Sequence, residues 1–205
     1  VQFGHAFDSY PNPIRQIETS PLLVTYSDQG SNGLSVNFQR HLRDNIVTWT
    51  EGSLPRPVHY NCWEAIYFEH DSNTLSEIVE LAADIGAERF VLDDGWFGTR
   101  DDDTQSLGDW NIDQRKYPGG LGSLISKVNQ CNMSFGLWFE PEMINPNSDL
   151  FRKHPNWILG PIDQMLGRNQ LVLDMANPEV QEYLFRKISS ILNDHNIAYI
   201  KWDHN

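Results

Sequence analysis

The stretch RFVLDDGWF, residues 89–97, changes character halfway along its length. Its first half is an apolar strand candidate, and Asp93 and Asp94 follow directly, with a Gly and a Trp behind them. Other apolar runs end in a similar way, at Trp63–Glu64, at WFEPE (residues 138–142), at Asp174 and at KWD (residues 201–203). In α/β folds, side chains at the carboxyl ends of the strands gather around a ligand. This repeated feature therefore bears on both the fold and the function.

Helical patterns separate these apolar runs. Strands are predicted at about residues 58–68, 89–94, 133–142, 170–175 and 198–203, and helices at about 74–85, 120–132, 148–154 and 177–196. Ser148 and Asn177 are predicted helix caps, with Pro178 in the first turn of the last helix and Pro155 ending the one before it. Strands that alternate with helices predict right-handed crossovers and a parallel sheet.

The absence of phosphate-binding motifs separates two candidate fold classes, a doubly wound sheet and a barrel. Doubly wound nucleotide-binding sheets carry a Gly-rich phosphate turn, and neither GxGxxG nor a Walker pattern occurs in the sequence. We therefore predict a (β/α)8 TIM barrel, of which the chain holds the N-terminal part, about five of eight strands. Because an open set of five strands leaves two apolar edges unpaired, we expect the chain to be truncated.

The first part of the chain has a different pattern. Residues 20–30 (SPLLVTYSDQG) predict a strand and a turn, and residues 32–47 predict a helix. We interpret residues 1–56 as the tail of a β-rich module with a connecting helix, and residues 57–205 as the first part of the barrel.

Composition limits the classes of partner. The net charge is −13, with 28 acidic and 15 basic residues, which disfavours nucleic acid and anionic membranes. No apolar run approaches the roughly 20 residues of a membrane span. Cys62 and Cys131 have no spacing typical of a disulfide framework or a zinc site, so we expect free thiols and a cytoplasmic protein. The first residues lack the basic and apolar regions of a signal peptide.

Tryptophan beside carboxylates at strand ends suits a sugar ligand. The apolar face of a pyranose stacks on an indole ring, and carboxylates accept hydrogen bonds from hydroxyl groups. A divalent metal is the competing interpretation, but neighbouring Asp93 and Asp94 point to opposite sides of a strand and no HxH, HExxH or CxxC spacing occurs. We therefore expect no metal and no cofactor.

Ordered motifs make the expectation more specific. They are NCWEA (61–65), FVLDDGWFGTRDDDTQSLGDW (90–110), YPGGL (117–121), GLWFEPEMINPNSDLFRKHPNWIL (136–159), GRNQLVLDMANPEVQEYL (167–184) and YIKWDHN (199–205). Together these motifs resemble bacterial α-galactosidases of glycoside hydrolase family 36 from about residue 57 onward. Residues 20–30 also resemble the end of that family's N-terminal β-sandwich and its linker. The resemblance therefore implies that residues 1–56 are the end of an N-terminal β-sandwich with a linker helix, and that residues 57–205 are the first part of a catalytic barrel.

The resemblance implies roles for individual residues. It makes Asp203 the nucleophile of a retaining mechanism. It implies that substrate contacts come from Trp63, Asp93, Asp94, Trp138, Arg168 and Asn205. In this assignment Asp93 and Asp94 bind the hydroxyls at carbons 4 and 6 of galactose, Trp63 and Trp138 form the wall, and Asn205 contacts the hydroxyl beside the anomeric carbon.

Strand periodicity adds Lys201, which lies on the same face as Asp203 and is expected to bind substrate and to keep that carboxylate ionised. Glu140 and Glu142 have no assigned role, and we consider them as partners of Lys201 or Arg168.

The implied activity is retaining hydrolysis of terminal α-D-galactosyl residues from oligosaccharides such as melibiose and raffinose, in a homotetramer. The family's general acid/base is an aspartate beyond the KWD motif, so we expect the chain to be inactive alone. Two alternatives stay open: a galactosyl transferase that makes raffinose-type sugars, and a non-catalytic sugar-binding protein.

Overall fold

The computed structural model describes residues 21–47 and 55–205, in a chain that divides into two units, Val1–Pro55 and Arg56–Asn205. The described part of the first unit contains helix α1 (Gly30–His41) and the π-helical turn η2 (Leu42–Ile46), which confirms the helix predicted over residues 32–47. The strand predicted over residues 20–30 is wrong for its described part, because residues 21–29 form none. Extended backbone without a neighbouring strand gains no ladder hydrogen bonds. The rest of the predicted β-sandwich lies outside the described residues.

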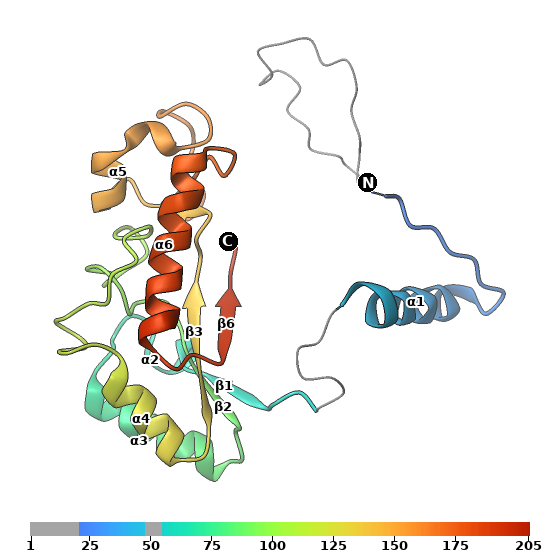
Figure 1. The fold of residues 1–205 in the computed structure, drawn as a ribbon, viewed down its shortest axis with the longest axis horizontal. Coiled ribbons are helices and arrows are strands. Elements are labelled where there is room, and N and C mark those ends of the chain that lie inside the picture. The colour runs from blue at the N-terminus through green and yellow to red at the C-terminus, as the bar shows by residue number, and fades with distance from the viewer. Residues whose placement is uncertain (1–20, 48–54) are drawn as a thin grey trace. The chain divides into compact units, whose positions relative to one another are not determined.

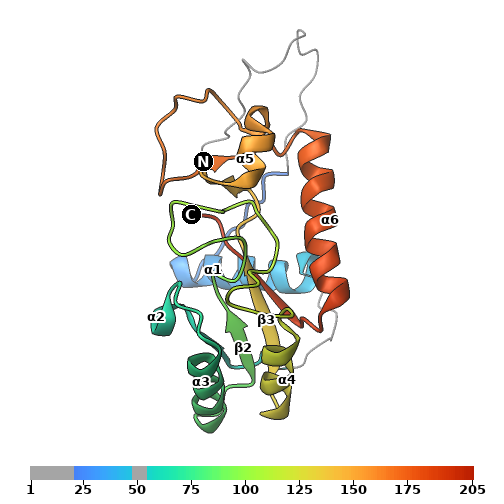
Figure 2. The same ribbon diagram turned by 90° about the vertical axis from the view of Figure 1, so that its left-hand side faces the viewer.

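The second unit is built on a parallel sheet. Its strands are β1 (His59–Asn61), β2 (Arg89–Leu92), β3 (Ser134–Phe139) and β6 (Tyr199–Trp202), in the order β1-β2-β3-β6. All three pairings are parallel. The crossovers carry helices α3 (Ser72–Asp84), α4 (Gly122–Gln130) and α6 (Pro178–Asp194), seen beside the sheet in Figures 1 and 2. This is the arrangement of part of a (β/α)8 barrel.

The predicted count of about five barrel strands is one too high for the described residues. The run at residues 170–175 forms only β5 (Leu171–Val172), which pairs antiparallel with β4 (Met143–Ile144). Strand β6 pairs directly with β3 instead. A short apolar run bounded by turns does not reveal the direction of its partner, so the sequence pattern could not separate these two outcomes.

The first predicted strand is also shorter than expected. Strand β1 ends at Asn61, and the one-turn helix α2 (Trp63–Ile66) follows. The Asn61 side-chain oxygen accepts a hydrogen bond from the Trp63 amide at 2.9 Å, which turns the chain into the helix.

Side-chain caps set the starts of three helices. At the start of α3, the Asp71 side chain accepts hydrogen bonds from two backbone amides. At the start of α6, the Asn177 side chain accepts from the Glu179 amide, and Pro178 lies in the first turn. Ser148 caps the short helix α5 (Asp149–Lys153), and the 3-10 helix η3 (Pro155–Trp157) begins at Pro155. The caps predicted at Ser148 and Asn177 are confirmed.

Aromatic side chains fill the core beneath the strand ends. Trp96, which follows the Asp93–Asp94 pair, and Trp110 are both buried, so neither indole ring is open to solvent. They pack against Phe97, Trp138 and Phe139, and the Trp96 indole donates to the Trp138 carbonyl at 2.9 Å. Large aromatic side chains contribute much of a core's hydrophobic stabilisation, so this cluster supports the strand ends that it packs against.

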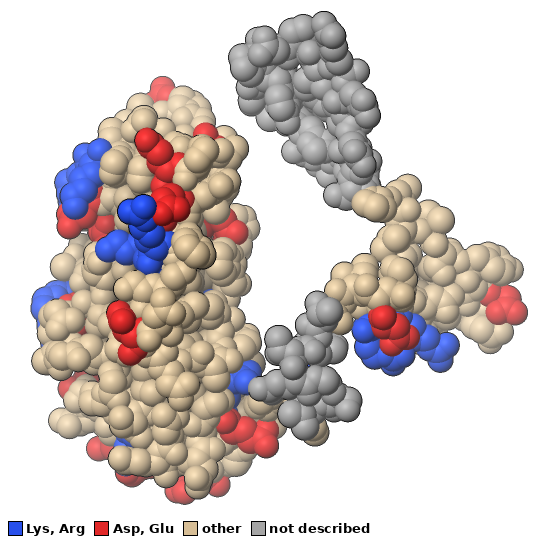
Figure 3. Space-filling model, in the orientation of Figure 1, with Lys and Arg blue, Asp and Glu red and all other residues tan. Residues whose placement is uncertain are grey.

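The described surface shows charges of both signs. On the face of the second unit in Figure 3, acidic and basic side chains are interspersed. Within residues 21–47 and 55–205, no helix has both the length and the apolar character that crossing a membrane requires. Cys62 and Cys131 are free thiols, as predicted.

Candidate active site

Three strand ends bring one buried carboxylate, one amide and one ammonium together. Asp93 directly follows β2, and its Oδ2 accepts from Asn61 Nδ2 at 2.5 Å and from Lys201 Nζ at 2.9 Å. Asn61 ends β1, and Lys201 lies in β6, two strands away from β2 in the sheet. Burial acts against the charged ammonium, but Asp93 and then Asp203 outweigh it and raise the pKa of Lys201. The lysine is therefore held as a cation between two carboxylates.

Asp203 is the second of these carboxylates. Its Oδ2 accepts from the Trp138 indole at 3.0 Å and lies 3.8 Å from Lys201 Nζ, while its Oδ1 accepts from the His204 amide at 3.1 Å. Burial opposes ionisation, but the Trp138 hydrogen bond and the Lys201 charge prevail and hold the pKa of Asp203 below its usual value. With its side chain 32% exposed, Asp203 is an ionised carboxylate within reach of solvent. These are the properties of a nucleophile.

Asp94 points away from this pair, toward a buried arginine. One edge of the Arg100 guanidinium makes a bidentate pair with it, Nε to Oδ1 at 2.7 Å and Nη2 to Oδ2 at 2.8 Å. The two side chains are only 1% and 7% exposed. Burial raises the pKa of Asp94, and the hydrogen bonds from Arg100 oppose that rise. A carboxylate has about four lone-pair sites, so Asp94 could accept a further donor beside Arg100.

Lys116 holds two loops together at this edge of the sheet through hydrogen bonds. Lys116 Nζ donates to the carbonyls of Phe68, Gly95 and Arg100 at 2.7–3.0 Å. These carbonyls belong to the loop after α2 and to the loop after β2. Each of the three bonds has a charged donor, which makes it stronger than a neutral one. The Arg100 backbone is therefore fixed relative to the end of β2.

A buried histidine supports the same loops. His70 Nδ1 lies 2.6 Å from the Tyr117 hydroxyl, and its Nε2 lies 3.0 Å from the Tyr67 carbonyl. A carbonyl only accepts, so Nε2 carries the proton and Nδ1 accepts from Tyr117. Burial, together with the nearby Lys116 charge, lowers the pKa of His70 to about 4. A side chain at Gly95, which has φ +110°, would come within 3.0 Å of this ring.

Two predicted sugar contacts, Arg168 and Asn205, are connected to Gln170, the first along the chain and the second by a hydrogen bond. Arg168 is exposed in a tight turn, with Gln170 two residues later. Gln170 Nε2 donates to Glu140 Oε1 at 3.0 Å and to the Asn205 carbonyl at 3.4 Å. Glu140 Oε1 also accepts from the Asn205 amide at 2.7 Å. Glu140 thus holds the Asn205 backbone, and the acidic partners of Lys201 are Asp93 and Asp203.

Trp63 has the least direct connection to the cluster. Its half-buried ring packs edge-on against Tyr67 and Phe68, and only its backbone amide reaches Asn61, the residue that holds Asp93. Glu142 points elsewhere, since its Oε1 accepts from the Trp202 indole at 3.1 Å.

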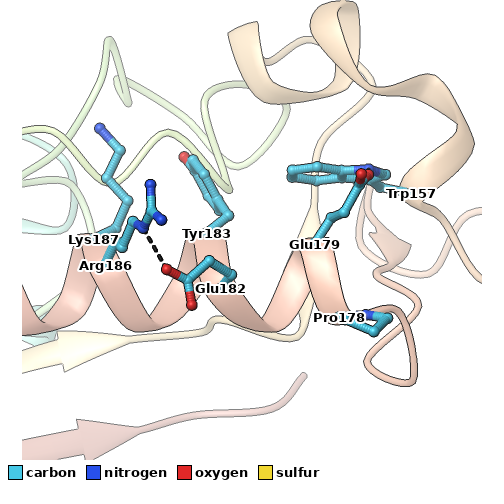
Figure 4. Close-up of a pocket in the computed structure, with 7 residues that line it drawn as sticks. All are labelled: Trp157, Pro178, Glu179, Glu182, Tyr183, Arg186 and Lys187. Atoms are coloured by element: carbon cyan, nitrogen blue, oxygen red, sulfur yellow. Dashed lines mark hydrogen bonds and ion pairs between the residues drawn. The ribbon is translucent and has the colours of Figure 1, made fainter.

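A separate groove runs along α6. Figure 4 shows its lining, in which Trp157 comes from η3 and the other side chains come from the helix. The lining residues are Trp157, Pro178, Glu179, Glu182, Tyr183, Arg186 and Lys187. None of the predicted site residues lines this groove.

Comparison with known proteins identifies the family. The sequence profile of the melibiase family matches residues 16–205. The chain belongs to the melibiase family. An α-galactosidase of Escherichia coli is 47% identical over 186 residues, which cover 90% of this chain and 26% of that protein.

Solved structures give the same relation for this melibiase-family chain. The α-galactosidase AgaB of Geobacillus stearothermophilus, from glycoside hydrolase family 36, superposes with a TM-score of 0.83 at 47% identity, over 88% of this chain and 25% of that one. A variant of AgaA from the same organism, solved in complex with raffinose, gives a TM-score of 0.82 at 46% identity, over 87% and 25%. The chain therefore spans about a quarter of the length of these relatives.

Several residues that shape the site were not singled out from the sequence. Asn61 was not recognised as a strand-end residue because the first strand was predicted to continue past it. Arg100 stands in the polar run GTRDDD, which is typical of a solvent-exposed loop. A basic residue a few positions after a strand-end Asp pair is the one available signal for a buried partner, and it is weak.

Proposed function

We propose that a protein of the relatives' full length that carries this chain is a retaining α-galactosidase. It removes terminal α-D-galactosyl residues from oligosaccharides such as melibiose and raffinose. The observation that carries this proposal is the Asp203 carboxylate, kept ionised by Trp138 and Lys201 at the carboxyl edge of a parallel sheet. The names of the relatives, and the raffinose complex of AgaA, support the substrate class.

The proposed reaction has two steps. An Asp203 oxygen attacks the anomeric carbon of galactose, and the bond from that carbon to the leaving oxygen breaks as a general acid protonates the oxygen. Water then cleaves the galactosyl ester, and the same acid group, now a base, takes the water's proton. The product keeps the α configuration. The acid/base is not assigned within this chain; by the resemblance it lies on a later barrel strand.

In the same proposal, Lys201, Asp93, Asp94, Arg168 and Asn205 bind the hydroxyls of galactose. A site built to pair with a hydroxyl rejects an epimer that leaves its buried polar groups unpaired. Asp93 and Asp94, both nearly fully buried, are the groups best placed to discriminate the axial 4-hydroxyl of galactose from the equatorial one of glucose.

The test removes the nucleophile and then replaces it. Asp203→Gly in the full-length protein is expected to lower kcat on an aryl α-galactoside by about 10⁴-fold or more, as loss of a catalytic nucleophile does. Added azide should restore turnover and yield the β-galactosyl azide, because the small anion attacks from the vacated face. Asp84→Ala, an exposed aspartate at the end of α3, serves as the control.

The outcomes separate the alternatives. Wild-type turnover in Asp203→Gly refutes the assignment of the nucleophile. Binding of galactose without turnover in the unmodified protein supports a sugar-binding protein. A product mixture dominated by transfer to sugar acceptors supports the galactosyl transferase.

A further inference from the structure

One buried amide links the two sides of the candidate site. Asn145 follows β4 and is fully buried. Its Oδ1 accepts from Arg100 Nη1 at 2.8 Å and from the Leu107 amide at 2.9 Å. Its Nδ2 donates to the carbonyls of Asp103 at 3.1 Å and Asn169 at 2.8 Å. All the hydrogen-bonding capacity of the amide is thus used, in an orientation that cannot be reversed.

The acceptor side of Asn145 holds the guanidinium that pairs with Asp94. Arg100 has three groups of partners, namely the two Asp94 oxygens, the Gln105 carbonyl and Asn145. A planar guanidinium with fixed donors passes its orientation on to the carboxylate it grips. Asn145 therefore contributes to where the Asp94 oxygens lie.

The donor side of Asn145 holds the turn that presents Arg168. Arg168 and Asn169 have φ values of +50° and +60°, and the Gln170 amide donates to the Gly167 carbonyl at 3.0 Å. Two successive residues at positive φ make a type I′ turn, in which Asn and Gly are preferred. An Arg in this conformation is unfavourable and persists only where its surroundings fix it. Asn145, bonded to the carbonyl of the second central residue, supplies such a restraint.

We propose that Asn145 is a positioning residue that fixes the Arg168 turn relative to the Asp94–Arg100 pair and so sets the affinity for galactose. This inference rests on the proposed function, in which Asp94 and Arg168 contact the sugar. Asn145 itself does not touch the substrate. It acts by holding two groups from different loops at one separation.

Asn145→Asp separates the two sides of the amide. The new side chain has nearly the same shape and still accepts from Arg100 and Leu107. Its second oxygen faces two carbonyl oxygens in place of an N–H group, so the bond to the Arg168 turn is lost and replaced by repulsion. The variant therefore loses the bonds to the Asn169 and Asp103 carbonyls, and it keeps the acceptor for Arg100 Nη1 and for the Leu107 amide.

Galactose binding in a double-mutant cycle provides the test, in a protein of the relatives' full length that carries this chain. The four proteins are the wild type, Asn145→Asp, Arg168→Ala and the double variant. Asn145→Asp is expected to weaken the Kd for galactose about 10-fold alone and less than about 2-fold in the Arg168→Ala background, because contacting or coupled groups are not additive. A residue that only stabilises the fold weakens both backgrounds equally, and that result, or no weakening at all, overturns the proposal.

Hydrogen exchange gives a second readout that does not depend on sugar binding. Peptides that cover residues 160–172 should exchange faster in Asn145→Asp than in the wild type, and peptides from α3 should not change. If the wild type binds no galactose, the proposed function fails, but exchange still decides whether Asn145 holds the turn: unchanged exchange overturns the inference. Where Asn145→Asp does not fold, Asn145→Ser is measured in the same way.

Discussion

Replacing Arg100 by Met should lower the free energy of unfolding by more than the loss of an exposed ion pair does. The guanidinium is 1% exposed, and it makes two hydrogen bonds to Asp94 and one each to Gln105 and Asn145. Met fills much of the same volume but leaves the Asp94 carboxylate buried without a counter-charge. Breaking a buried pair in this way costs about 3–5 kcal/mol of the free energy of unfolding. The two neutral acceptors add less, because an unpaired neutral acceptor costs less than an unpaired charge and Asn145 Oδ1 keeps the hydrogen bond from the Leu107 amide.

The dependence on pH identifies the cause. Burial already raises the pKa of Asp94, and loss of Arg100 raises it further. A carboxyl group with a higher pKa in the folded state lowers the free energy of unfolding at pH values above its unfolded pKa of about 4. At those pH values the group ionises freely only in the unfolded chain. The penalty of Arg100→Met is therefore largest at pH 7 and shrinks as the pH falls toward 4. Adding Asp94→Asn should recover part of the loss at pH 7 and remove this dependence.

Urea unfolding, followed by tryptophan fluorescence at pH 7 and pH 4, measures both effects. The matched control is Arg152→Met, because Arg152 pairs with Asp149 in a helix where both side chains are more than half exposed. That change should cost less than about 1 kcal/mol. The reasoning is refuted if Arg100→Met costs no more than the control, or if its penalty is the same at both pH values.

Two further predictions concern the nucleophile and the buried histidine. Trp138→Phe removes the indole donor from Asp203 and should raise the pKa of that carboxyl, so the acid limb of kcat/KM moves to higher pH. The control is Trp110→Phe, because the buried Trp110 indole N–H has no hydrogen-bond partner among the described residues, and this change should leave the acid limb in place. Equal shifts in the two variants would contradict the assignment. With its folded pKa near 4 against 6.5 when unfolded, His70 contributes stability that is complete above about pH 6.5 and falls by about 3 kcal/mol as the pH drops to 4. His70→Gln keeps an acceptor and a donor, and should remove that part of the pH dependence of urea unfolding; an unchanged slope would show that His70 is not its source.

The part of the site that sequence predicted best follows from strand periodicity. Lys201 and Asp203 lie two residues apart, and the structure places both beside one another at the end of β6. Asp93 lies at the end of β2, at the edge where parallel strands must all deliver their carboxyl ends. The alternation of side chains along each strand sets which residues share a face, and that alternation is a property of the local sequence.

The parts that sequence did not predict depend on contacts between distant segments. The direction of β5 depends on β4, which lies 27 residues earlier in the register Ile144 to Leu171. Arg100 is buried because Lys116 and Asn145 hold its loop against the strand ends. A charged residue in a polar loop has no local feature that separates this outcome from exposure to solvent.

The adjacent residues Asp93 and Asp94 depend on different parts of the structure, Asp93 on the pairing of the strands and Asp94 on a loop. Neighbours on a strand point to opposite sides, and here Asp93 faces Lys201 while Asp94 faces Arg100. The sheet alone places Asp93, because its partner comes from another strand. Asp94 needs the loop after β2 to fold back, and its geometry is therefore only as well defined as that loop. Substitutions in the loop should consequently change the groups that recognise the sugar, through Asp94, before they affect the pair of Lys201 and Asp203.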